Sequence, residues 1–126
     1  MATKNGSITA TGATRLGTQA MGSVGRWIVQ LSGTWAATIK FEGIVEQVAA
    51  PAGGANGDAQ GSGLTLASNA TGIATTNITT QAVVSGATGV TANGLYWVDG
   101  SGMDVQIDCT AFTSGTIVWD AREVRG

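Results

Sequence analysis

The sequence predicts an all-β protein, an antiparallel β-sandwich of the jelly-roll type with about eight strands. The first observation is composition: the 126 residues include 20 glycines but a single proline, which is typical of short strands joined by glycine-rich turns. The second is a repeated alternation of apolar and polar residues, the period of a half-buried strand. The third is that no segment carries the apolar stripe of an amphipathic helix.

The first 24 residues differ from the rest of the chain because they are rich in Thr, Gly and Ala and contain few large apolar side chains. Residues 7–11 are expected to form one short edge strand. The remainder of this stretch cannot bury enough surface to become ordered by itself. We therefore expect an extended N-terminal arm over residues 1–24, which docks on a neighbouring molecule, and a β-sandwich domain over residues 25–126.

Alternation within the predicted domain indicates its strands and turns. Residues 49–63 contain little to bury and are expected to form a long loop. Asn93-Gly94 is a strong signal for a type I′ hairpin turn, because both residues tolerate a positive φ. The clearest predicted strands cover residues 27–31, 35–41, 103–111 and 117–122, and the last two are expected to close the domain as a long hairpin.

Four tryptophans have two possible roles, core packing or stacking on a sugar. Most share a strand face with aliphatic residues, which favours the core. Trp97 is ambiguous, because its neighbours Tyr96 and Val98 face the other side of the strand. The same alternation predicts that Cys109, the only cysteine, is a small buried apolar residue. The four are Trp27, Trp35, Trp97 and Trp119.

The absence of histidine removes the imidazole base of Ser-His-Asp and Cys-His catalysis and the usual zinc ligands. Residues 99–104 faintly resemble a calcium loop but lack its spacing and its terminal glutamate, so a hairpin turn is expected there. A pair of carboxylates could hydrolyse a glycoside, but the candidates fall on polar strand faces or at strand ends, where charges keep a protein soluble. We expect no enzyme, no cofactor and no metal; the carboxylates considered are Glu42, Glu46, Asp120 and Glu123.

Charged residues make up only 11% of the chain, against 43% hydrophobic residues, whereas soluble domains contain about 25% charged residues. We interpret this deficit as a surface that is largely covered by partners. The net charge is −2 and the six Lys and Arg residues are scattered, so nucleic acid is not expected as a ligand. No apolar run predicts a signal peptide or a membrane span, so the chain is expected to be made and to assemble in a cytoplasm.

Three segments resemble landmarks of small β-sandwich proteins from tailed-bacteriophage virions. Residues 33–43, GTWAATIKFEG, are similar to a "GTW…T…FEG" strand of that family. Residues 93–98, NGLYWV, resemble its strand after an "NG" turn, and residues 111–116, AFTSGT, resemble a later hairpin. They occur in the order found in the family, which includes capsid decoration (cement) proteins.

The resemblance implies a non-enzymatic virion protein, in the first place a capsid decoration protein that binds the major capsid protein as a homotrimer. The alternatives are a tail or fibre accessory protein and a carbohydrate-binding module for host attachment. In the first reading the N-terminal arm lies over capsid subunits, and scattered arginines form ion pairs with a partner. The expected contact residues are Thr3, Lys4, Ile8, Arg15, Arg26, Arg122 and Arg125.

Overall fold

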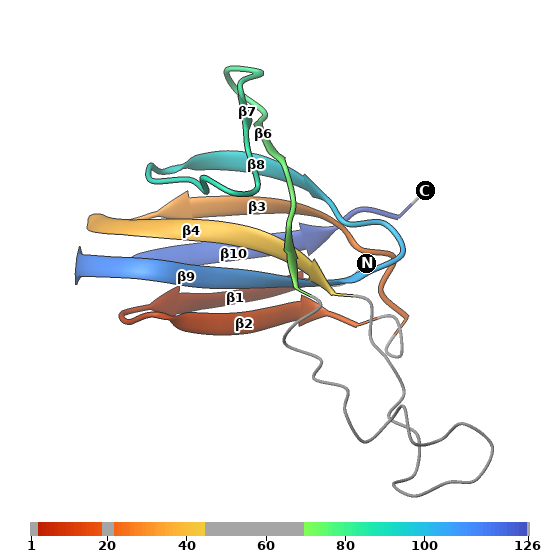
Figure 1. The fold of residues 1–126 in the computed structure, drawn as a ribbon, viewed down its shortest axis with the longest axis horizontal. Helices are drawn as coiled ribbons and strands as arrows, with labels where there is room; N and C mark the ends of the chain where they lie inside the picture. Colours follow the sequence, from red (N-terminus) through yellow and green to blue (C-terminus); the bar gives the residue numbers. More distant parts are fainter. Residues whose placement is uncertain (1–2, 19–21, 45–69, 126) are drawn as a thin grey trace, which may run out of the picture.

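The computed structural model describes residues 3–18, 22–44 and 70–125 (Figure 1). Within these ranges it has ten strands and no helix, so it also has no helix suited to crossing a membrane. The predicted loop over residues 49–63 lies outside the described residues. The strands are β1 (Thr3–Ile8), β2 (Gly12–Gly17), β3 (Arg26–Ser32), β4 (Trp35–Ile44), β5 (Thr71–Gly72), β6 (Thr75–Asn77), β7 (Val83–Val84), β8 (Gly94–Asp99), β9 (Asp104–Gly115) and β10 (Ile117–Glu123).

The strands form two antiparallel sheets, one in the order β1-β10-β3-β8-β6-β7 and the other in the order β2-β9-β4-β5. If the short β6–β7 hairpin is set aside, the pairs are nested: β1 with β10, β2 with β9, β3 with β8 and β4 with β5. Nested pairing is what results when one long hairpin is folded over into two sheets, as in an eight-stranded jelly roll. The predicted all-β sandwich of this type is confirmed. The predicted closing hairpin of residues 103–111 and 117–122 is wrong, because β9 and β10 belong to different sheets.

The core lies between the two sheets and consists of alternate side chains from both. On β10, Ile117, Trp119 and Ala121 are at most 4% exposed, and on β9 the inward residues include Ile107 and Cys109. Burial of a large aliphatic or aromatic side chain contributes about 1.5–3 kcal/mol. The predicted period-two burial is therefore what holds the sheets together, and burial also raises the pKa of the Cys109 thiol.

The N-terminal residues 3–17 belong to the sandwich, which differs from the arm expected over residues 1–24. β1 pairs with β10 and β2 pairs with β9, so each strand completes the edge of a different sheet (Figure 1). Backbone hydrogen bonds to strands of the same chain order this segment without many large side chains. Ile8 and Leu16 are the buried anchors, at 8% and 0% exposed. Docking on a neighbour is not needed to order them.

Asn93-Gly94 does not form the predicted hairpin turn, since neither residue has a positive φ and Gly94 begins β8. Instead the Asn93 side chain accepts a hydrogen bond from Trp35 Nε1 at 2.6 Å and donates one to the Gly33 carbonyl at 2.8 Å. The Asn93 side chain thus connects the start of β8 to the turn between β3 and β4 by hydrogen bonds. A local turn signal was overridden by these contacts between distant segments.

The tryptophans divide between the core and the surface. Trp27 and Trp119 are buried, at 1% and 4% exposed, as predicted. Trp35 is partly buried and packs against the core. Trp97 points outward from β8, because Tyr96 and Val98 on either side of it are the buried residues.

Candidate functional site

Several apolar side chains lie outside the core, on the outer surface of the six-stranded sheet. In the part of the chain that the structure describes, the exposed large hydrophobic residues are Val83, Leu95 and Val118, at 66%, 36% and 46%. All three point away from the core, because their neighbours along each strand point inward. Ile28 and Trp97, which are opposite one another in β3 and β8, lie half-buried on the same side. We call Ile28, Val83, Leu95, Trp97 and Val118 the apolar face.

Charged and polar residues lie beside and between the residues of the apolar face. A hollow of about 300 Å³ is lined by Ile28, Gln30, Leu95, Asp120 and Arg122. Nearby, Arg26 is opposite Asp99 in the β3–β8 register. A hydrogen bond from the Ser101 side chain is the main cause that lowers the pKa of Asp99, with a further contribution from Arg26. Apolar side chains next to polar and charged groups are the usual composition of a protein interface.

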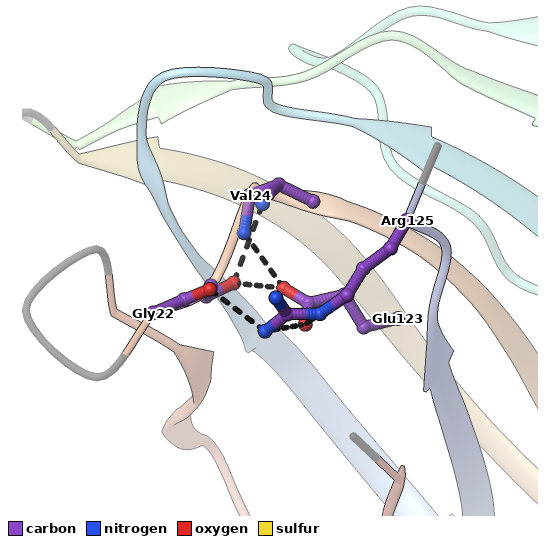
Figure 2. A network of polar contacts seen from close by, with 6 residues as sticks. Gly22, Val24, Glu123 and Arg125 are labelled. Atoms are coloured by element: carbon purple, nitrogen blue, oxygen red, sulfur yellow. Dashed lines mark hydrogen bonds and ion pairs between the residues drawn. The ribbon is translucent and has the colours of Figure 1, made fainter. Parts of the chain in front are cut away.

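At one end of the sandwich a buried carboxylate holds the chain before β3 against the C-terminal strand (Figure 2). Glu123 is fully buried, and its Oε2 accepts hydrogen bonds from Ser23 Oγ at 2.5 Å and from the Val24 N–H at 2.8 Å. Arg125 pairs with Oε1 at 3.0 Å and donates to the Gly22 carbonyl at 2.7 Å. We call Gly22, Ser23, Val24, Glu123 and Arg125 the C-terminal latch.

The latch determines the charge of Glu123. Burial raises the pKa of this carboxyl, but the hydrogen bonds from Ser23 and Val24 and the charge of Arg125 lower it by more, so its pKa lies below the ordinary value. Glu123 is therefore an ionised, fully bonded carboxylate with a structural role. It is not a carboxyl poised to release or accept a proton near neutral pH.

Beside the latch lies a pocket of about 190 Å³, which we call the edge pocket. It sits where β1 and β2 approach each other, and Lys4 Nζ donates to the Arg15 carbonyl at 3.4 Å across that gap. Three of the six Lys and Arg residues of the chain line it. The lining residues are Lys4, Arg15, Leu16, Gly17, Thr18, Ser23, Trp27, Glu123 and Arg125.

The predicted contact residues therefore fall in several places. Lys4, Arg15 and Arg125 gather at the edge pocket. Arg26 and Arg122 lie on the outer side of the six-stranded sheet, by the apolar face. Thr3 is exposed at the start of the edge strand β1, whereas Ile8 is a core residue at 8% exposed, so its side chain faces the interior.

The carboxylates considered for glycoside hydrolysis are not brought into one site. Glu42 lies on the outer face of the four-stranded sheet, where it accepts a hydrogen bond from Gln106 at 2.7 Å. Asp120 lies on the outer face of the other sheet, Glu123 is in the latch, and Glu46 is outside the described residues. Among the described residues no group of three or more His, Cys, Asp or Glu side chains is placed to hold a metal ion.

Sequence reasoning placed Glu123 at a polar position and missed its burial. The signal was present, because Glu123 continues the inward series of Ile117, Trp119 and Ala121 at intervals of two. Asp104 is also buried, at 2% exposed, and pairs with Arg15 at 3.2 Å. Its position has the outward parity of β9, so the alternation could not have identified it.

Comparison with known proteins gives one weak structural likeness. No protein-family model and no curated protein matches the chain. Its structure is similar to the crystal structure of the SPBc2 prophage-derived protein YomS, with 15% sequence identity and a TM-score of 0.48. The match covers 96% of this chain and 94% of that one. A likeness at this level transfers no activity or partner.

Proposed function

We propose that the chain is a non-enzymatic structural protein of a phage virion, and specifically a capsid decoration protein that binds the major capsid protein. The observation that carries the proposal is the apolar face. Val83, Leu95 and Val118 place exposed aliphatic groups on one side of one sheet, and exposed apolar groups rimmed by polar residues mark a surface that binds another protein. The family resemblance of residues 33–43, 93–98 and 111–116 supplies the virion context.

The binding mode differs from the one expected from sequence. Residues 3–17 are integrated in the sheets, so a long arm that lies over capsid subunits is not part of the proposal. The apolar face takes that role, and Asp120 and Arg122 at its margin would give the contact its orientation. Many copies, each binding weakly, would stabilise a lattice through multivalency. A homotrimer remains our expectation for the bound form.

Carbohydrate binding is less well supported. Trp27 and Trp119 are in the core, and the Trp35 indole is fixed by Asn93. Trp97, half-buried on the apolar face, therefore provides a single stacking surface for a sugar ring.

The proposal is tested by adding the purified protein to heads of the encoding phage from which its gene has been deleted. We expect saturable co-sedimentation with a fixed number of copies per head, and a higher temperature of head disruption. Binding to isolated tails in place of heads would support the tail or fibre alternative. Saturable binding on a glycan array with none to heads would support the attachment module; both outcomes contradict the decoration role.

A further inference from the structure

The two edge strands β1 and β2 offer free backbone groups beside the edge pocket. In the described ranges β1 pairs only with β10 and β2 only with β9, so the other edge of each strand is open. The two edges run side by side at one side of the sandwich (Figure 1), and the Lys4–Arg15 hydrogen bond joins them. An open strand edge can pair with an extended segment of another polypeptide, which adds as a further strand.

The edge pocket is positively charged on a protein whose net charge is −2. Lys4, Arg15 and Arg125 line it; Arg15 pairs with Asp104 and Arg125 with Glu123, so the excess is one positive charge, that of Lys4. The Glu123 carboxylate is already satisfied by the latch, and Lys4 is exposed at the rim. The local excess of positive charge favours an anionic group.

Trp27, one of the residues that line the pocket, carries a hydrogen-bond donor without an acceptor in the described part of the chain. Trp27 is 1% exposed, and its Nε1–H has no partner among the described residues. A Cβ atom on Gly17 would lie 2.8 Å from both Trp27 Cζ2 and Ser23 Oγ, so this edge of the indole faces two residues that line the pocket. Cζ2 is bonded to the carbon that carries Nε1. A buried donor without an acceptor is costly, and an acceptor on a group bound in the pocket would remove that cost.

We infer that the edge pocket binds the carboxylate of an Asp or Glu side chain in an extended segment of a partner polypeptide that pairs with the free edge of β1. The carboxylate pairs with Lys4 and accepts the hydrogen bond that Trp27 Nε1–H lacks, while its methylene stem contacts Leu16. The volume of about 190 Å³ suits one side chain, since pockets for whole small molecules are usually about 300 Å³ or larger. This site is separate from the apolar face and does not depend on the proposed function.

The test uses the ¹⁵N-labelled full chain and two nine-residue peptides of alternating Thr and Val, one with a central Glu and one with a central Gln. We expect the Glu peptide to shift the Trp27 indole N–H signal and the β1 amide signals saturably. The Gln peptide should bind at least about tenfold more weakly, because charge-assisted hydrogen bonds are the stronger ones. No shift with the Glu peptide overturns the inference.

Two small anions test whether the bound anionic group belongs to a polypeptide or to a small molecule. Sodium butyrate carries the carboxylate without a backbone, and inorganic phosphate carries charge without a methylene stem. Both should bind much more weakly than the Glu peptide. Butyrate binding as tightly as the peptide would show a small-molecule site and overturn the polypeptide assignment. Equal binding of phosphate would show an unselective anion site and overturn the carboxylate assignment.

Matched variants locate the contact. Lys4→Gln should weaken binding of the Glu peptide about threefold to fivefold, as expected for an exposed charge. Lys40→Gln makes the same charge change on the four-stranded sheet and should leave binding unchanged; equal weakening by both variants would reduce the effect to net charge and overturn the inference. Gly17→Ala should abolish binding by filling the pocket beside Trp27, with retained indole signals of Trp97 and Trp119 showing that the variant is folded. Peptide binding should survive substitutions on the apolar face, so the two proposals can fail separately.

Discussion

The outer faces of the two sheets differ in chemistry although both come from the same alternating pattern. On the four-stranded sheet the outward residues of β4 and β9 are largely polar: Lys40 is opposite Asp108, and Glu42 is opposite Gln106. We call these four residues the polar face. Ile44, which lies on that side, is buried at 4% exposed. On the six-stranded sheet the outward positions include the residues of the apolar face, together with polar residues such as Gln30 and Asp120.

The difference shows which outer face departs from the polar surface expected of a β-sandwich that has no binding partner. A sheet with one face in the core normally presents polar groups on the other, and the polar face follows this rule. The apolar face does not follow this rule, because Val83, Leu95 and Val118 expose apolar surface to water, which is unfavourable. We conclude that the six-stranded sheet is the side on which partner binding should be sought.

The largest expected effect comes from placing charge on the apolar face. The double substitution Leu95→Asp and Val118→Asp should weaken binding to phage heads about 100-fold or more, because two buried apolar contacts of about 1.5 kcal/mol each would be lost. Co-sedimentation over a range of protein concentrations measures the change. The matched control is the single substitution Lys40→Asp on the polar face, which makes the same change of two units in net charge and for which we expect unchanged head binding. Equal loss in both variants would show that the two faces do not differ in function.

A smaller effect, about 2 kcal/mol of unfolding free energy, is expected from Glu123→Gln. The substitution removes the charge that Arg125 pairs with and leaves a donor facing a donor in a buried place. Glu42→Gln, on the polar face, should cost about 0.5 kcal/mol or less. Urea unfolding followed by tryptophan fluorescence compares the two. An equal loss of unfolding free energy in the two variants would mean that Glu42 on the polar face stabilises the fold as much as Glu123 in the latch.

The fold was predictable from sequence because its cause is visible there. Alternation in residues 27–31 and 117–122 gives the inward side chains directly, since a strand has only two faces. Trp27, Leu31 and Ile117 are all at most 1% exposed. The nested pairing of β1 with β10 and β2 with β9 was not visible locally, because backbone hydrogen bonds depend little on side-chain type. For that reason residues 3–17 resembled an arm.

The candidate sites were less predictable because they depend on contacts between distant segments. Lys4, Arg15 and Arg125 were identified as scattered charges, and only the fold brings them to one pocket. Asn93 was interpreted as a turn residue, whereas it binds Trp35 and Gly33. The apolar face could have been found from outward positions such as Val118 once the inward parity of β10 was known.

The pH dependence of stability should distinguish the latch from the polar face. The folded-state pKa of Glu123 is below its ordinary value of 4.5, with burial opposing the lowering and the contacts of Ser23, Val24 and Arg125 producing it. A lowered pKa gives stability that is present above about pH 4.5 and is lost as the pH falls through the folded pKa. The stability difference between the wild type and Glu123→Gln should therefore shrink on acidification below pH 4.5, as measured by urea unfolding at each pH. A difference that stayed constant down to full protonation would contradict the latch as its source.

The smallest expected effect is that of salt on the stability of the isolated protein. The charges of the polar face are partly exposed, and salt weakens the interactions of exposed charges, with those more than about 10 Å apart largely screened at 0.1 M. Raising the NaCl concentration from 0.05 to 0.5 M should change the unfolding free energy by about 0.5 kcal/mol or less, apart from the general salt effect seen equally in a Lys40→Gln, Glu42→Gln variant. A larger loss in the wild type than in this variant would show that the polar face is a coupled ionic network with a structural role. In that case ion pairs of the polar face would contribute to the folding free energy, and the two outer faces would differ in this contribution as well as in the exposure of apolar side chains.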